Sequence, residues 1–116
     1  MISLVIPKLP FIDKEKTLDY YHKLGFELVA DHGDYLITKY QDLEIHFFRF
    51  ETLQIEKSDF MIYLRIDSDI ENFYQDIQDQ GVEIHPNGKL ETKPWGMIEF
   101  ALIDPNGTLL SFGQEN

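Results

Sequence analysis

A chain of 116 residues, 43% hydrophobic and 14% aromatic, is long enough for one hydrophobic core, too short for two independent domains and too rich in aromatic residues to be disordered. Its formal charge of −11 would repel the phosphates of a nucleic acid and attract cations, although solubility alone also accounts for an acidic surface. The absence of cysteine excludes disulfides and thiolate metal ligands.

The first half of the chain predicts one strand, one helix and three further strands. Leu4–Ile6 is typical of an opening strand, and because no signal-peptide or membrane-spanning pattern precedes it, we expect a cytoplasmic protein without a membrane partner. A helix is predicted over Lys14–Leu24, since Asp13 is a good N-cap and Gly25 suits the position after the last turn. Three strands are then predicted at Phe26–Ala30, Tyr35–Tyr40 and Leu43–Phe50.

The second half repeats this order after a polar connector at residues 51–59. A strand at Phe60–Ile66 precedes an amphipathic helix, capped by Asp67, Ser68 or Asp69 and ended by Gly81. Three more strands are predicted at Val82–Ile84, Met97–Ile103 and Thr108–Phe112. In the Asp104-Pro105-Asn106-Gly107 turn, Pro presets one dihedral angle, while Asn and Gly tolerate left-handed ones. We therefore expect one domain of two duplicated modules, about 1–52 and 58–116.

Alternation along the strands predicts one apolar and one mixed face. Leu43, Ile45 and Phe47 share a face that helices should cover, and the opposite face is lined by polar side chains and by apolar ones. The polar ones are Glu44, His46, Tyr63, Arg65 and Glu99, and the apolar ones are Phe48, Phe50 and Met61. Such a face is either solvated or curved around a pocket, and its apolar side chains favour the pocket.

At this point the sequence resembles the vicinal oxygen chelate superfamily, which contains glyoxalases, dioxygenases and bleomycin-resistance proteins. The strongest match is near the C-terminus, in Pro94-Trp95-Gly96, Glu99-Phe100-Ala101-Leu102 and Asp104-Pro105-Asn106-Gly107. Weaker matches are Tyr20-Tyr21-His22-Lys23-Leu24-Gly25-Phe26, Asp42 to Phe48 and Leu64-Arg65-Ile66-Asp67. The resemblance implies an α+β fold, in which two βαβββ modules form a cup-shaped mixed sheet with helices on its outer face.

Metal-dependent members of this superfamily use four inward positions, typically His, Glu, His and Glu. By resemblance, these positions fall on Ile6, His46, Met61 and Ser111, which cannot supply the converging N and O donors that a hard divalent ion needs. We therefore expect no metal and no other cofactor. A different metal site built from Glu44, His46 and Glu99 remains an alternative.

The bleomycin-resistance proteins, by contrast, are acidic, metal-free homodimers that sequester a bulky cationic drug in grooves between their subunits. The resemblance therefore implies a homodimer that binds a cationic small molecule of the bleomycin type, with no catalytic residues. We therefore expect a binding protein and not an enzyme. The alternative is a metal-dependent lyase, isomerase or dioxygenase that acts on a small metabolite.

Candidate ligand contacts follow from this reading. Trp95, beside the flexible Gly96, can stack on a planar heterocycle or hold a cation, although packing in the core or in a dimer is an equally good use for it. Further aromatic contacts and polar contacts, including groups for cations, are predicted at Tyr35, Phe48, Phe60, His46, Asp59 and Glu99. An aromatic side chain on a strand is, however, more often part of the core than of a binding site.

Overall fold

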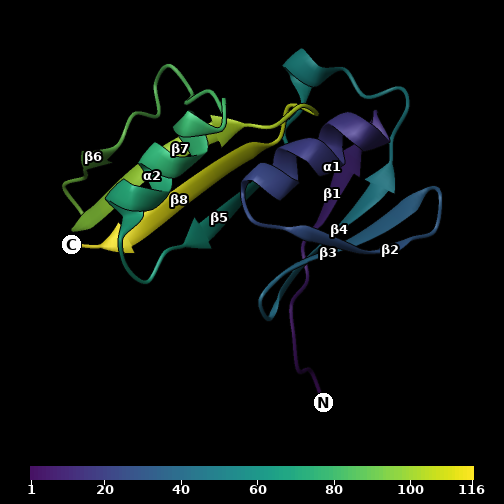
Figure 1. Ribbon diagram of the computed structural model, residues 1–116, viewed down its shortest axis with the longest axis horizontal. Helices are drawn as coiled ribbons and strands as arrows, with labels where there is room; N and C mark the ends of the chain where they lie inside the picture. Colours follow the sequence, from purple (N-terminus) through teal and green to yellow (C-terminus); the bar gives the residue numbers. More distant parts are fainter.

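The computed structural model describes residues 1–116 and consists of two βαβββ modules (Figure 1). The first module contains β1 (Lys8–Phe11), α1 (Lys14–Lys23), β2 (Glu27–Asp31), β3 (Tyr35–Tyr40) and β4 (Leu43–Arg49). After a short 3-10 helix (Ile55–Lys57), the second contains β5 (Met61–Arg65), α2 (Ile70–Asp79), β6 (Glu91–Thr92), β7 (Met97–Ile103) and β8 (Leu109–Glu115). The predicted α+β class with two βαβββ modules is confirmed.

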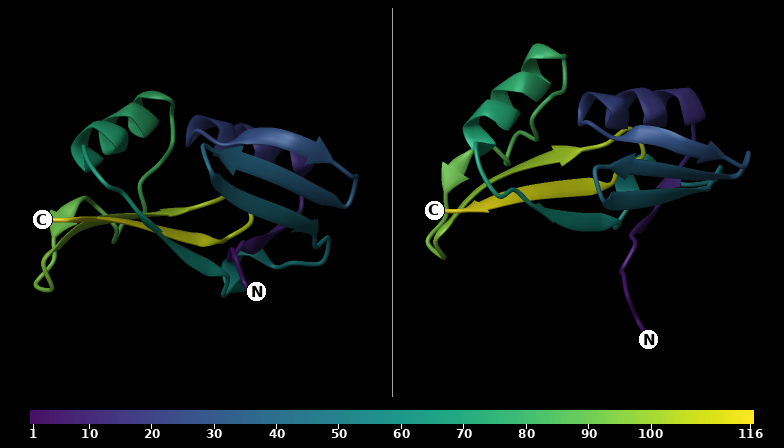
Figure 2. Two further views of the ribbon diagram at one scale, coloured as in Figure 1. Left: turned by 90° about the horizontal axis from the view of Figure 1, so that it is seen from below. Right: turned by 60° about the horizontal axis from the view of Figure 1, so that its bottom comes forward.

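Each module forms its own four-stranded mixed sheet. The strand orders are β1-β4-β3-β2 and β5-β8-β7-β6, so the second sheet repeats the first. In each, the opening strand pairs in parallel with the closing one, and all other pairs are antiparallel. Figure 2 shows α1 and α2 on the same side of the molecule, above the sheets. Neither ten-residue helix is long and apolar enough to cross a membrane.

The helix ends follow from local chemistry. The carboxylate of Asp13 accepts a hydrogen bond from the backbone N–H of Lys16 at 2.9 Å, as the sequence predicts. Gly25 follows α1 with φ +105°, a conformation that favours glycine. At α2 the expected capping differs, because the Asp69 side chain makes no cap hydrogen bond. Instead, the side-chain carbonyl of Gln114 accepts from the N–H of Ile70 at 2.9 Å.

The predicted opening strand at Leu4–Ile6 is wrong. The first strand starts at Lys8, and the preceding segment extends away from the body of the protein (Figure 1) with Ile2 94% and Val5 91% exposed. None of residues 1–6 forms a hydrogen bond, so their strand-like composition finds no pairing partner within the chain. Apolar alternation predicts an extended backbone, but it cannot say which strand accepts it.

The predicted strand at Val82–Ile84 is also wrong, although Val82 does enter the core. Between α2 and β6, the chain pairs with β7 only around Ala101, whose C=O accepts from His85 and whose N–H donates to Gly88. Between these contacts, Pro86 has no N–H to donate, and Gly88 uses its N–H in a turn back to His85. Regular pairing is therefore left to the two residues of β6. At the other end, the last strand runs beyond the predicted Phe112 to Glu115.

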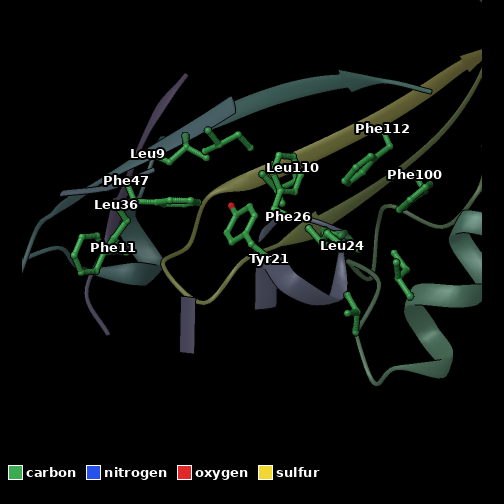
Figure 3. Packing of buried hydrophobic residues seen from close by; sticks show 14 of the residues in the cluster. Leu9, Phe11, Tyr21, Leu24, Phe26, Leu36, Phe47, Phe100, Leu110 and Phe112 are labelled. Carbon is green, nitrogen blue, oxygen red and sulfur yellow. The ribbon is translucent and has the colours of Figure 1, made fainter. Parts of the chain in front are cut away.

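The core is made of side chains from both modules (Figure 3). In the first module, Tyr21 of α1 packs on Phe47 of β4, with ring centroids 4.8 Å apart. In the second, Phe73 of α2 packs on Phe112 at 5.4 Å, and Phe112 stacks on Phe100 at 4.8 Å. Each helix therefore covers the apolar face of its own sheet, as alternation predicts.

The Asp104–Gly107 turn joins the two modules through buried polar contacts. The Asn106 side chain accepts from the N–H of Ile12 at 2.9 Å and donates to the hydroxyl of Thr17 at 3.1 Å. Asn106 does not adopt a left-handed conformation, whereas Gly107 does, with φ +81°. The expectation that both residues serve the turn by their backbone freedom is thus correct for Gly107 only. The side-chain amide of Asn106 instead forms hydrogen bonds with module 1.

Candidate functional site

The sheet faces opposite the helices carry the predicted polar side chains. On β4, Ile45 and Phe47 are buried beneath α1, whereas Glu44, His46 and Phe48 on the other face are partly exposed. On β5 and β7, the outward positions are occupied by Tyr63, Arg65 and Glu99, as the alternation predicts. We call these helix-free faces the outer faces of the two separate sheets, although the predicted cup would turn them inward. Their side chains form three groups.

The first group is a hydrogen-bonded chain on the outer face of the first sheet. The Tyr35 hydroxyl lies 2.7 Å from Nδ1 of His46, and Nε2 of the same imidazole lies 3.0 Å from Oε1 of Glu44. Lys8 Nζ lies 5.2 Å from the centroid of the Tyr35 ring. Because both imidazole nitrogens are engaged, the ring of His46 is fixed in orientation. The group presents a phenol, an imidazole and a carboxylate to one surface.

The second group is aromatic and bridges the modules. Phe48 of β4 lies 6.3 Å from Phe50 and 6.0 Å from Phe60, and Phe50 and Phe60 are 6.5 Å apart, all between ring centroids. The three rings are partly exposed. Phe60 directly precedes β5, so this group places the first sheet beside the start of the second module. Partly exposed, tilted aromatic rings are suited to contact a planar apolar ligand.

The third group lies on the outer face of the second sheet and centres on a carboxylate. Oε2 of Glu99 accepts from the Tyr63 hydroxyl at 2.8 Å and from Nε1 of Trp95 at 3.3 Å. Trp95 is itself 65% exposed. Arg65 lies over the Tyr63 ring at 5.7 Å and pairs with Glu115 at 3.5 Å. The arrangement offers a fixed anion beside an open aromatic surface.

Electrostatics reinforce this arrangement. Desolvation raises the pKa of Tyr63, and the hydrogen bond to the Glu99 carboxylate raises it further, because ionised Tyr63 would place two negative charges together. Tyr63 therefore stays a neutral donor to Glu99 at physiological pH. The second carboxylate oxygen, Oε1, accepts no hydrogen bond from the protein. It is free to bind a donor from outside.

A largely apolar groove of about 550 Å³ runs between the two modules. It is lined by 18 residues, among them Leu43, Glu44, Tyr63, Arg65 and Phe73. Glu44 of the first group and Tyr63 of the third lie at this groove, but His46, Trp95 and Glu99 do not line it. Within one chain, the groove therefore touches the edges of the predicted site without containing it.

Six of the eight predicted site residues are thus distributed over the three groups. His46 meets Tyr35, Phe48 meets Phe60, and Trp95 meets Glu99. Asp59 is exposed and makes no ion pair, and Gly96 closes the turn that carries Trp95, with φ +84°. Contact between the predicted site residues and a ligand remains a prediction.

Several members of these groups are absent from the predicted ligand contacts, among them Phe50 and Tyr63. Phe50 joins the Phe48 and Phe60 rings, and Tyr63 donates to Glu99. Strand alternation places both on the mixed face together with the predicted contacts. Their position on that face is the sequence signal that could have identified them. The length of a Tyr side chain then explains how Tyr63 reaches beyond its neighbouring strand.

The donor set implied by the metal-dependent members of the fold family does not fit a metal. Ile6 and Met61 offer an alkyl group and a thioether, and only His46 and Ser111 carry N or O donors. The imidazole of His46 already uses both nitrogens on Tyr35 and Glu44. No three His, Asp or Glu side chains are grouped closely enough to hold an ion. We therefore derive no chemistry through a metal.

Comparison with known proteins identifies the family. A bleomycin resistance protein of Klebsiella pneumoniae is 33% identical over 115 residues, which cover 95% of this chain and 90% of that protein. The crystal structure of a bleomycin resistance determinant encoded on the transposon Tn5 matches with a TM-score of 0.88 and 32% identity over 99% of both chains. A bleomycin-binding protein solved in complex with bleomycin matches with a TM-score of 0.87 and 32% identity, over 99% of this chain and 100% of that one. Because the family model also matches residues 7–112, the resemblance seen in the sequence is confirmed, and the chain belongs to the Glyoxalase/Bleomycin resistance protein/Dioxygenase superfamily.

Proposed function

We propose that this protein binds and sequesters a bulky cationic small molecule of the bleomycin type without transforming it. The observation that carries the proposal is the full-length similarity, at 32% identity, to a protein whose structure contains bleomycin. The proposed place of action is the cytoplasm.

The charge and the outer faces support a cationic ligand. The formal charge of −11 creates a field that concentrates cations near the surface. Glu99 offers a carboxylate oxygen without a protein donor, next to the exposed indole of Trp95. A planar cation can stack on that ring while it donates a hydrogen bond to the carboxylate, and the two interactions reinforce each other. An anionic ligand would meet no such complement.

A homodimer is part of the proposal. Met61 and Trp95, each 65% exposed, and Tyr63, 48% exposed, present apolar surface on the second sheet. Exposed apolar patches of this kind favour association. A second copy would bring its own outer faces to this surface, so a groove between subunits could combine groups from both chains. A ligand much larger than a single side-chain group would then be enclosed from two sides.

The test is isothermal titration calorimetry with bleomycin, combined with sedimentation velocity. We expect saturable binding, two sites per dimer and survival of cells that express the protein in the presence of the drug. Elemental analysis of the same sample serves as the control for the alternative enzyme function. No heat of binding and no protection would contradict the drug assignment, and a stoichiometric transition metal would favour a metal-dependent enzyme.

A further inference from the structure

Gly113 occupies an unusual place on the outer face of the second sheet. It lies on β8 and is paired with Glu99 of β7 on one side and with Arg65 of β5 on the other. A Cβ atom built at Gly113 would lie 1.7 Å from the Tyr63 hydroxyl oxygen and 2.7 Å from the adjoining ring carbon. The ring of Tyr63 therefore occupies the space that any other residue at position 113 would fill with its side chain.

This empty position lets Tyr63 reach a strand that is not its neighbour. Tyr63 stands on β5, opposite Ser111 of β8, yet its hydroxyl donates to Glu99 on β7 at 2.8 Å. The side chain crosses β8 over Gly113 to do so. The same carboxylate oxygen also accepts from Trp95, so two donors hold Oε2 while Oε1 accepts from none.

The need for glycine here is not a matter of backbone conformation. Gly113 is absent from the positive-φ glycines and lies within the regular pairing of β8. Any residue could adopt its backbone angles, and β-strands disfavour glycine. What excludes a larger residue is the contact with Tyr63. Cγ of Glu99, at 3.2 Å from the same Cβ position, would need to move by only a few tenths of an ångström.

We propose that Gly113 is a positioning residue for the ligand-binding face. Because position 113 carries no side chain, Tyr63 can cross β8 and hold the Glu99 carboxylate in place. The free oxygen of Glu99 then binds the cationic group of the ligand beside the Trp95 ring. This inference rests on the proposed function, and it names the anionic subsite within it. Gly113 itself touches no ligand and acts through Tyr63.

A measurement without ligand tests the positioning. Trp95 is the only tryptophan, so its indole N–H gives a single resolved peak in a ¹H–¹⁵N spectrum. We expect Gly113→Ala to displace the exposed Tyr63 ring and shift this peak, and Tyr63→Phe to shift it in the same direction. Ser111→Ala is the matched control, because Ser111 lies on the same face of β8 and its side chain forms no hydrogen bond. It should leave the peak in place.

A binding measurement tests the consequence. In calorimetry with bleomycin, we expect Gly113→Ala and Tyr63→Phe each to weaken binding by about tenfold, the effect of losing one hydrogen bond to a charged group. Ser111→Ala should bind as the unmodified protein does. In a Tyr63→Val background, where no ring crosses β8, adding Gly113→Ala should cause no further loss.

The outcomes separate the positioning role from the proposed function. An unchanged indole peak in Gly113→Ala, or a further loss on adding it to Tyr63→Val, overturns the positioning role whatever the protein binds. Normal bleomycin affinity in a Gly113→Ala protein with a shifted peak overturns the link between Glu99 and the ligand. If the unmodified protein binds no bleomycin but the peak shifts as expected, the drug assignment fails and the positioning of Glu99 by Gly113 stands.

Discussion

The Tyr21 hydroxyl donates a hydrogen bond of 2.6 Å to Oδ2 of Asp104, and the pair joins the first helix to the turn between the last two strands. Both residues are buried, and Oδ1 of the same carboxylate accepts from the N–H groups of Asn106 and Thr108 at 2.8 and 2.9 Å. All three donors are neutral, so a buried carboxylate is held by hydrogen bonds alone. This contact, together with Asn106, couples the two modules.

Loss of the Tyr21 hydroxyl should therefore destabilise the fold. In Tyr21→Phe, the buried carboxylate loses a donor while the ring packing is kept, and we expect the free energy of unfolding to fall by about 1–3 kcal/mol. Urea unfolding followed by circular dichroism measures it. Tyr40→Phe is the control, because the Tyr40 hydroxyl forms no hydrogen bond. Equal stability of the two variants would show that the Tyr21–Asp104 bond contributes nothing to the fold.

The Asp104 carboxylate should also make the free energy of unfolding depend on pH. Burial raises the pKa of Asp104 above its usual value of 3.8, against the opposing effect of its hydrogen bonds. The folded protein thus binds this proton more tightly than the unfolded chain does. Its contribution to stability is present in full below the unfolded pKa and is lost as the pH rises through the folded pKa.

Asp104→Asn removes this titration, and other carboxyl groups are common to both proteins. We expect the unfolding free energy of the unmodified protein, minus that of Asp104→Asn, to decrease as the pH rises from about 3 towards neutrality. Urea unfolding at a series of pH values gives this difference. A difference that increases with pH would mean that the hydrogen bonds, and not burial, determine the pKa of Asp104.

Local signals in the sequence predicted most of the fold. The Asp13 cap and Gly25 delimit α1 within one residue, and the alternation of Met97–Ile103 coincides with β7. Each of these features depends on residues that are close in the chain. The opening strand was wrong for the complementary reason, since the pairing of Leu4–Ile6 depends on a partner that local pattern does not identify.

The candidate site was predictable only in part, for the same physical reason. Alternation placed Glu99, His46 and Tyr63 on the mixed face, and this placement is confirmed. Which of these side chains meet depends on register and on side-chain reach across strands. Asn106 contacts Ile12 from 94 residues away, and Tyr63 reaches Glu99 only because position 113 lacks a side chain. No spacing within one segment carries that information.

Neutralising Glu99 should weaken ligand binding more than neutralising an unrelated carboxylate. Glu99→Gln and Glu56→Gln both change the formal charge from −11 to −10, so the long-range field is matched. Glu56 lies exposed in the connector. We expect calorimetry with bleomycin to show a loss of about threefold to tenfold for Glu99→Gln, a weaker dependence of its affinity on salt, and little change for Glu56→Gln. Equal effects of the two variants would reduce the role of Glu99 to its share of the net charge.

Trp95 can serve the ligand or a subunit interface, and two measurements on the same variants distinguish these uses. Because Trp95 is 65% exposed within one chain, Trp95→Ala should change the unfolding free energy little. If the ring stacks on the ligand, we expect Trp95→Ala to lower bleomycin affinity by about tenfold or more, and Trp95→Phe to retain part of it. Val29→Ala, at an exposed position of β2, is the control. Sedimentation velocity decides between the two uses. If Trp95 stacks on the ligand, the Trp95→Ala protein remains a dimer. If Trp95 packs in the subunit interface, the Trp95→Ala protein dissociates into monomers, and its loss of affinity follows from the loss of the dimer.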